Sequence, residues 1–306
     1  MANVAPTSSF TGGQQWLVKI QQGRELERIS QKPILAPARR DAIESRGVLN
    51  PAVVEIDSQL LMVYRAEGRD GASRLRSATS SDGISWSRNG MLLDKPAEHL
   101  QLEDPRLTKT SDGRVIMTCT EANMREKVAK IAIYERAGNT FERIGEVDKE
   151  HEKASDKDGA LFPERIGGEY KMLRRPWPNI EIASSKELSG PWTTQTKGFI
   201  APREGMWDNG WVGGGAPPIL TDKGWFILYH GADTDRVYRL GADLVEKDNP
   251  SKVLWRSDRP LLEPKLAWEI NGVVSKVVFA CAAIERSGNL WVWYGGADFA
   301  IGAAML

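Results

Sequence analysis

The chain has few of the residues that build disulfide frameworks, metal sites and membrane spans. Its 306 residues include 2 cysteines and 3 histidines, and no apolar run approaches the roughly 20 residues that a transmembrane helix needs. No histidine pair has metal-ligand spacing and no Cys-His cluster exists, so neither a metal site nor a membrane span is expected. Cys119 and Cys281 fall in predicted strands, where buried free thiols in a reducing cytoplasm are expected.

The chain also lacks a charge surplus. Lysine plus arginine equals aspartate plus glutamate at 41 each, which argues against a nucleic-acid-binding protein, because those proteins normally carry excess basic charge. The N-terminus shows no basic region followed by an apolar core, so a cytoplasmic protein without a secretory signal is expected. Residues 1–15 are polar and are predicted to be a flexible segment ahead of a single domain, residues 16–306.

Short apolar runs recur along the chain at a nearly constant spacing. They begin at Leu60, Val115, Tyr170, Trp225 and Leu290, so successive starts are 55, 55, 55 and 65 residues apart. A turn signal rich in Asp, Ser or Gly precedes each run, and another strand-like segment precedes each turn, which predicts five hairpins. Units of this length predict an all-β fold, a five-bladed β-propeller.

The two ends of the domain carry similar segments. Pro33–Pro37 (Pro-Ile-Leu-Ala-Pro) resembles Pro260–Pro264 (Pro-Leu-Leu-Glu-Pro). This similarity predicts that the first strand completes the last blade and closes the ring, which protects strand edges that would otherwise be free to pair.

The repeat predicts which distant residues meet. Aligned on the period, the ends of the second strands are Arg65, Thr120, Arg175, His230 and Gly295. Equivalent positions of a propeller gather around its axis, and packing alone does not explain buried charges there. An active site in the central funnel is therefore expected. Asp104, in the segment Glu103-Asp104-Pro105-Arg106 that opens the second unit, is the best-placed acid.

Eleven tryptophans point toward a sugar ligand, because aromatic faces stack on the apolar faces of pyranose rings. Trp86, Trp192, Trp225 and Trp291 sit at strand or turn positions and are expected in the core. Trp177, Trp207 and Trp211 lie in Gly- and Pro-rich loops and are candidates for contact with a ligand.

These motifs together resemble a known family over most of the chain, from about Asn50 to Gly302. The matching segments are Tyr64-Arg65-Ala66, Glu103-Asp104-Pro105-Arg106, Lys157-Asp158, Leu161-Phe162-Pro163, Gly213-x-Gly215-x-Pro217-Pro218, Tyr229-His230-Gly231, Tyr238-x-Leu240-Gly241-Ala242, Val277-Val278-Phe279 and Tyr294-Gly295-Gly296-Ala297-Asp298. In order and spacing they resemble glycoside hydrolase family 130, the β-mannoside phosphorylases and β-mannosidases. The resemblance also implies a five-bladed propeller.

The resemblance implies a mechanism and a set of site residues. Asp104 would be the general acid and would protonate the leaving oxygen through a hydroxyl of the bound mannose, while inorganic phosphate attacks the opposite face with inversion. Arg65, Lys157, Arg175 (or its neighbour Arg174) and His230 would hold the phosphate, and no other cofactor is implied. The same loops supply candidate substrate-binding residues, which are Asp158, Trp207, Asp208, Trp211 and Asp298.

One position departs from the family pattern. The phosphorylases' phosphate-binding lysine is expected near position 211, where this chain has Trp211. A hydrolase would instead need a carboxylate base, for which Asp208, Glu204 and Glu269 are candidates. Phosphorolysis of an oligosaccharide is the favoured interpretation, hydrolysis of the same β-mannosidic bonds stays open, and a non-catalytic glycan-binding propeller is the third alternative. A homo-oligomer is left open.

Overall fold

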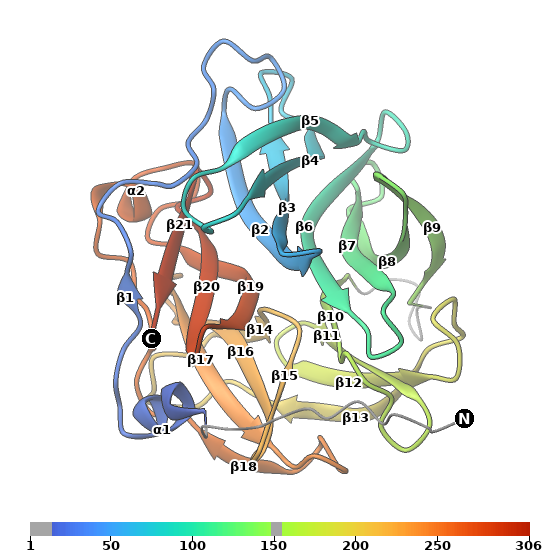
Figure 1. Ribbon diagram of the computed structural model, residues 1–306, viewed down its shortest axis with the longest axis vertical. Helices are drawn as coiled ribbons and strands as arrows, with labels where there is room; N and C mark the ends of the chain where they lie inside the picture. Colours follow the sequence, from blue (N-terminus) through green and yellow to red (C-terminus); the bar gives the residue numbers. More distant parts are fainter. Residues whose placement is uncertain (1–13, 148–154) are drawn as a thin grey trace, which may run out of the picture.

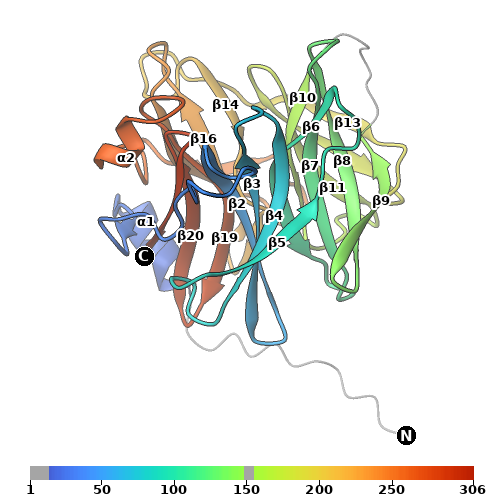
Figure 2. The ribbon, with the colours of Figure 1, turned by 90° about the horizontal axis from the view of Figure 1, so that it is seen from above.

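The computed structural model describes residues 14–147 and 155–306, which form a five-bladed β-propeller (Figures 1 and 2). The predicted fold is therefore confirmed. The first blade consists of β2 (Gly47–Ile56), β3 (Gln59–Glu67), β4 (Ser73–Ser80) and β5 (Ser87–Leu93). The second consists of β6 (Leu100–Lys109), β7 (Val115–Asn123), β8 (Val128–Ala137) and β9 (Thr140–Glu146).

The other three blades repeat this antiparallel order, with one interruption. The third blade consists of β10 (Asp156–Leu161), β11 (Tyr170–Pro176), β12 (Ile180–Ser185) and β13 (Thr193–Ile200). In the fourth, the first strand is split into two pieces that both pair with the second strand: β14 (Trp211–Gly214), β15 (Ile219–Thr221), β16 (Gly224–Ala232), β17 (Tyr238–Val245) and β18 (Val253–Arg256). The fifth consists of β19 (Val278–Arg286), β20 (Asn289–Gly296), β21 (Ala300–Met305) and β1 (Glu27–Arg28).

Two short helices lie outside the sheets, α1 (Gln15–Gln21) and α2 (Ala267–Ile270) (Figure 1). Helix α1 places the last residue of the predicted flexible segment in a helix, while residues 1–13 lie outside the described residues. Of the helices in the described ranges, neither has the length and hydrophobicity needed to cross a membrane.

The hairpins of the first and fifth blades form because their turn residues tolerate left-handed backbone. Asp57 and Ser58 have φ of 50° and 64°, and Ser287 and Gly288 have φ of 52° and 76°. Two consecutive left-handed residues define the type I′ turn, whose twist matches that of two antiparallel strands. The turn signals read from the sequence therefore correspond to the turns that join the first and second strands.

The ring is closed by the N-terminal strand. β1 pairs with β21, with Glu27 opposite Met305 and Arg28 opposite Ala304 (Figure 1). The closure is as predicted, but the strand is Glu27–Arg28 rather than Pro33–Pro37. In the predicted segment, Leu35 makes a single bridge to Ile301.

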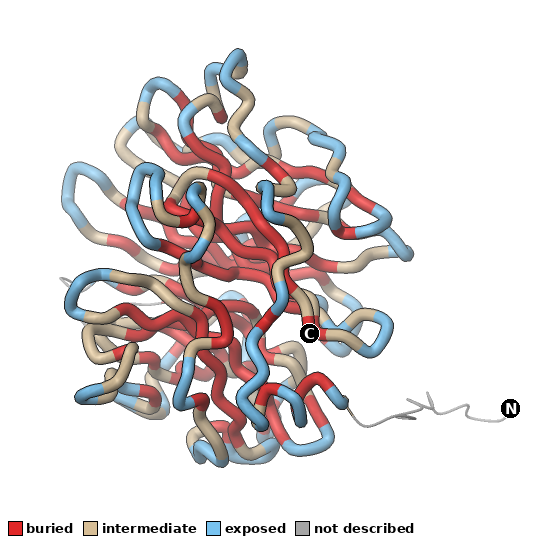
Figure 3. Tube along the Cα trace, turned by 90° about the vertical axis from the view of Figure 1, so that its left-hand side faces the viewer, coloured by how far each residue is buried: buried red, intermediate tan, exposed pale blue. Residues whose placement is uncertain are grey.

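Apolar side chains fill the spaces between blades, and the buried residues follow the strands while the exposed ones follow the loops (Figure 3). The ring of Phe162 meets Trp225 edge-on at 5.2 Å, which joins the third blade to the fourth. Of the tryptophans predicted in the core, Trp192 and Trp225 are buried, whereas Trp86 and Trp291 are partly buried and pack against it.

The innermost strands of three consecutive blades share one irregularity. β2, β6 and β10 each have a register shift, and at each shift lies a residue with left-handed φ: Asn50 (49°), Asp104 (50°) and Asp158 (59°). These residues are 54 positions apart. A bulge turns a side chain away from the regular alternation, and here the bulges bring polar side chains of neighbouring blades into contact near the axis.

Candidate active site

A cavity of about 170 Å³ lies where the five blades meet. Each blade contributes at least one residue, for example Asn50 from the first, Glu103 from the second and Tyr238 from the fourth. The full lining is Asn50, Arg65, Glu103, Asp104, Lys157, Arg175, Tyr238, Val274, Val277, Phe279 and Asp298. Five of the ten predicted site residues are among them: Arg65, Asp104, Lys157, Arg175 and Asp298.

Asp104 is held on this cavity by the first two blades. Its Oδ1 accepts hydrogen bonds from Asn50 Nδ2 at 2.7 Å and from Arg65 Nη1 at 3.4 Å. Burial by itself would raise the pKa of the Asp104 carboxyl. The charges of Arg65 and Lys157 and the bond from Asn50 outweigh burial and hold this pKa below its usual range. The carboxyl is therefore ionised at neutral pH in the ligand-free protein.

Three cationic side chains face the same cavity. Arg65 also pairs with Glu67 at 2.7 Å and with Glu103 at 3.3 Å, and Lys157 Nζ lies 2.9 Å from Glu103 Oε2. Arg175 stands opposite Lys157 in the pairing of β10 with β11. Because these cations are partly exposed, they remain accessible to an anion entering the cavity.

Asp298 is the other carboxyl from the predicted set on this cavity. It follows β20 at a φ of 50°. Burial raises the pKa of the Asp298 carboxyl to about 6, although Arg65 acts in the opposite direction. Its proton is therefore released closer to neutral pH than the proton of Asp104.

His230 and Asp158 lie beneath the cavity rather than on it. Asp158 is fully buried and binds Arg175 Nε at 2.6 Å and Arg106 Nη2 at 3.1 Å. His230 is also fully buried, with its Nε2 3.5 Å from Asp158 Oδ2 and its ring 4.2 Å from that of Phe279. Burial lowers the pKa of His230 to about 3, so the ring is neutral. The predicted contact of His230 with phosphate is thus corrected to a supporting position.

Glycine residues leave space for the side chains that lie beneath the cavity. Gly213 stands opposite His230 in the pairing of β14 with β16, and a Cβ at Gly213 would collide with His230 Nε2 and Asp158 Oδ2. Below, Arg106 donates to the carbonyls of Gly214 and Gly215, each at 2.7 Å. The Gly213–Gly215 run therefore gives space to the side chains that orient Arg175.

Trp211, which replaces the expected lysine, is one contact away from the cavity. Its ring meets Tyr238 edge-on at 5.5 Å, and Tyr238 lines the cavity. Trp177 is 68% exposed and is not among the lining residues.

The prediction that Trp207 and Asp208 bind substrate is corrected, because the structure places both residues in a separate cluster away from the cavity. Asp208 is fully buried and binds Arg256 Nη2 at 2.7 Å, the Tyr229 hydroxyl at 2.8 Å and Arg203 Nη2 at 3.1 Å. Trp207 stacks on Tyr229 at 5.7 Å. With its oxygens bound by cations and a hydroxyl, Asp208 has no access to a substrate in the cavity.

The other two candidate bases also lie away from the cavity. Glu269 is fully buried and is bound by Arg28 at 2.7 Å and by the Tyr294 hydroxyl at 2.7 Å. Glu204 is exposed in the loop ahead of β14. Neither belongs to the lining residues.

Sequence reasoning missed Asn50, Glu103 and Tyr238 as parts of the cavity. For Asn50 a signal was available, because Asn50-Pro51 precedes Asp104-Pro105 by the same 54 residues that separate Asp104 from Asp158-Gly159. Within the described ranges, no group of three or more histidine, cysteine, aspartate or glutamate residues is placed to hold a metal ion.

The chain is similar to known mannoside phosphorylases over most of its length. The family model described as beta-1,4-mannooligosaccharide phosphorylase, glycoside hydrolase family 130, matches residues 25–306. A 1,2-beta-oligomannan phosphorylase of Thermoanaerobacter sp. (strain X514) is 39% identical over 298 residues, which cover 92% of this chain and 97% of that protein.

Two solved structures share the fold. The beta-1,2-mannobiose phosphorylase of Listeria innocua, solved in complex with beta-1,2-mannobiose, has a TM-score of 0.79 at 26% identity, covering 92% of this chain and 96% of that chain. A structure from work on family 130 hydrolases that target beta-1,2 mannosidic linkages in Candida mannan has a TM-score of 0.82 at 26% identity, covering 99% and 96%. With this family match, fold and catalytic class agree, and the chain belongs to glycoside hydrolase family 130, the mannoside phosphorylases.

Proposed function

We propose that this protein is an inverting phosphorylase that acts on β-1,2-linked mannosides, transfers a terminal mannosyl group to inorganic phosphate and releases mannose 1-phosphate with a shortened chain. The observation that carries the proposal is the meeting of the candidate acid, Asp104, with three cations, Arg65, Lys157 and Arg175, on a cavity that Glu103 and Asp298 also line. An inverting enzyme needs an acid on one face of the sugar and room for a nucleophile on the other.

The cations favour phosphate over water as the nucleophile. Phosphate carries its own negative charge, so it needs a basic cradle and no second carboxylate as base. Water would need such a base, and the candidates Asp208 and Glu269 are buried in ion pairs elsewhere. Of the other carboxyls on the cavity, Glu103 is paired with Arg65 and Lys157, which leaves Asp298 as the base that a hydrolase would use. Lys157 and Arg175 supply positive charge for phosphate, which Trp211, in the place of the expected lysine, does not.

The same cations connect phosphate binding to the state of the acid. Arg65 and Lys157 keep the pKa of Asp104 low in the ligand-free protein. A bound phosphate dianion offsets these charges, so the pKa of Asp104 rises when the nucleophile arrives. The acid therefore gains its proton in the complex that uses it, which matches the requirement for a catalytic pKa near the working pH.

The proposed β-1,2 linkage is based on the substrates named for the similar proteins. The Thermoanaerobacter and Listeria proteins are named for β-1,2-linked mannosides, whereas the family description names β-1,4-linked ones. The 39% identity over nearly the whole chain favours the β-1,2 linkage. A cytoplasmic location is proposed with it, because both cysteines are free and buried.

The reaction is tested by incubating the protein with β-1,2- and β-1,4-mannobiose, each with and without phosphate, while mannose 1-phosphate and free mannose are measured. We expect mannose 1-phosphate from the β-1,2-linked substrate only when phosphate is present. Phosphate-independent release of mannose would identify a hydrolase. Absence of both products from either substrate would refute the proposal.

Replacement of the candidate acid is the matching test. Asp104→Asn should lower kcat by about 10²- to 10⁴-fold, the usual contribution of a positioned general acid. Asp94→Asn serves as the control, because Asp94 is a 63%-exposed carboxylate paired with Arg74 on the outside of the first blade. A near-normal rate in Asp104→Asn would remove Asp104 from the acid role.

A further inference from the structure

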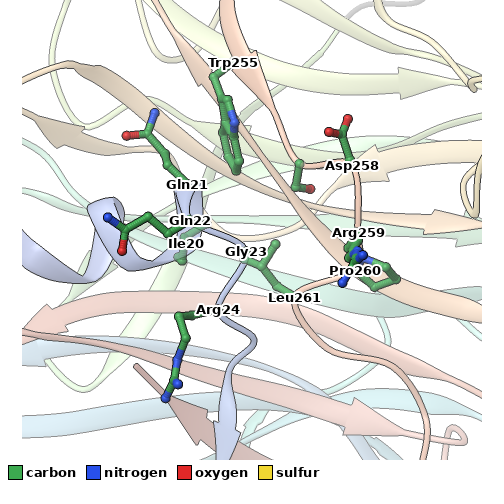
Figure 4. A pocket seen from close by; sticks show the side chains of 11 residues that line it. Ile20, Gln21, Gln22, Gly23, Arg24, Trp255, Asp258, Arg259, Pro260 and Leu261 are labelled. Atoms are coloured by element: carbon green, nitrogen blue, oxygen red, sulfur yellow. The ribbon is translucent and has the colours of Figure 1, made fainter.

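A second hollow, of about 400 Å³, lies on the outer side of the propeller between the fourth and fifth blades (Figure 4). Its lining comes from residues 20–24 at the end of α1, from Trp255 in β18, and from residues 257–261 after that strand. We call it the rim hollow. It shares no residue with the cavity around Asp104, and its volume is within the range of small-molecule sites, about 300–1,000 Å³.

The rim hollow combines one aromatic face with a ring of planar polar groups. Trp255 is half-buried and packs against the core that joins the fourth and fifth blades, while it also lines the hollow. Gln21 and Gln22 lie on one side of it, and Asp258 and Arg259 on the other (Figure 4). Amides, carboxylate and guanidinium together offer both donors and acceptors around the indole.

This combination fits a pyranose better than a protein or an anion. A sugar ring has an apolar C–H face that stacks on an aromatic ring and a rim of hydroxyls that need both donors and acceptors. An anion would favour a cationic site, yet of the two arginines in the lining Arg24 is paired with Glu27 at 3.0 Å, and the Asp258 carboxylate, 90% exposed, offsets the charge of Arg259.

The walls are fixed by backbone hydrogen bonds before any ligand arrives. Leu26 N donates to Leu261 O at 2.9 Å, and Leu261 N donates to Leu240 O at 2.7 Å. Ser257 is held on both sides, since its hydroxyl accepts from Ala242 N at 3.0 Å and its carbonyl from Arg203 at 2.9 Å. A preformed site avoids part of the ordering cost of binding.

We propose that the rim hollow is a second glycan-binding site, in which Trp255 stacks on a pyranose of a β-mannoside chain while the chain end is free to enter the central cavity. The identity of the sugar rests on the proposed function, whereas the site itself rests on the chemistry of the hollow. Two sites on one molecule raise the local concentration of chain ends near Asp104 when a single chain spans both.

The test is affinity electrophoresis in gels that contain a long β-1,2-mannan. Every protein compared carries Asp104→Asn, so that the mannan is not degraded during the run. We expect Trp255→Ala to weaken retardation by about tenfold in apparent Kd. Leu254→Ala is the matched control, because Leu254 is an exposed apolar residue of the same strand and does not line the rim hollow. It should migrate like its parent.

A second variant covers the case in which loss of Trp255 disturbs folding. Gln22 and Asp258 are exposed, so the double variant Gln22→Ala/Asp258→Ala should fold and still lose several-fold in affinity. Unchanged retardation in both variants would overturn the proposal. A change of oligomeric state in Trp255→Ala, measured by light scattering, would also overturn it, because the hollow would then be a contact between copies of this chain.

Electrophoresis needs no turnover, so its outcome is separable from the proposed reaction. Retardation by the mannan that depends on Trp255, in a protein without phosphorolytic activity, would refute the reaction and keep the site. Phosphorolytic activity in a protein whose binding to mannan does not depend on Trp255 would keep the proposed reaction and refute the second site.

Discussion

At Asp104 a single backbone position sets both the direction and the charge state of the candidate acid. The left-handed φ of 50° is a conformation that aspartate and asparagine tolerate better than most residues. It turns the carboxyl toward Asn50 and Arg65, where hydrogen bonds and positive charge stabilise the ionised form. Direction and acidity thus have one structural cause.

Removal of one nearby cation should shift the pH dependence of the reaction. Lys157→Met removes a charge that lowers the pKa of Asp104. The acid then stays protonated to higher pH, and the alkaline limb of kcat/KM moves upward in pH. Because Lys157 also belongs to the proposed phosphate cradle, kcat/KM for phosphate should fall about tenfold or more.

Lys157→Arg is the control for this prediction. It keeps the charge and should retain the wild-type position of the alkaline limb, measured from initial rates across the pH range. An unshifted limb in Lys157→Met would show that Lys157 does not act on the titrating group.

Individual site residues were predictable where a motif and the repeat agree. Arg65, Arg175 and Asp104 reach the cavity as the repeat predicts. His230 occupies an equivalent strand position but fills the space above Asp158 that Gly213 leaves. Asp208 could not be placed by spacing, because its partner Arg256 lies 48 residues away, at the other end of the fourth blade.

At the level of elements, the fourth blade is where the repeat changes form. Its first strand is divided into β14 and β15 around Pro217 and Pro218, which cannot donate to a ladder. The sequence predicts one strand-like segment ahead of the fourth turn, whereas the structure has two pieces there, Trp211–Gly214 and Ile219–Thr221. The first piece is rich in glycine and gives little strand signal, although it carries the glycine opposite His230.

Gly213 should be intolerant of any side chain. Gly213→Ala would place a methyl group against His230 and Asp158, and overpacking of this kind costs about 1–3 kcal/mol in the free energy of unfolding. It should also displace Arg175 and reduce kcat/KM for phosphate. Urea denaturation and initial rates measure the two effects.

Gly138→Ala separates packing from backbone strain. Gly138 has a φ of 61°, and a Cβ there would meet nothing within 4 Å, so the variant should lose about 1 kcal/mol and keep its phosphate kinetics. Equal kinetics in the two variants would contradict the role given to the layer beneath the cavity.

At the level of the whole molecule, closure of the ring depends on a buried ion pair as well as on a short strand. Arg28 of β1 binds Glu269 through two nitrogens, at 2.8 and 2.7 Å, and also donates to Glu263 O at 2.6 Å. Strand pairing over only two residues would hold β1 weakly to the fifth blade. The bonds of Arg28 therefore connect β1 to the segment that precedes the fifth blade.

Arg28→Ala should destabilise the protein strongly, because it leaves the buried carboxylate of Glu269 without its cation. The expected loss is about 3–5 kcal/mol in the free energy of unfolding. Arg24→Ala is the control: its pair with Glu27 is exposed, at 62% and 72% of the two side chains, and should contribute at most about 1 kcal/mol. Equal losses in urea denaturation would refute the proposed role in closure.

The recurrence of Asn50, Asp104 and Asp158 at one backbone position has an electrostatic consequence. If duplicated units had kept an aspartate at every equivalent position, several carboxylates would crowd one axis and repel one another. The first blade carries asparagine instead, and Gly213 stands 55 residues after Asp158. The three equivalent positions therefore have three different electrostatic tasks: Asp104 is the candidate acid, Asn50 is a neutral donor to that acid, and Asp158 is a carboxylate that binds Arg106 and Arg175.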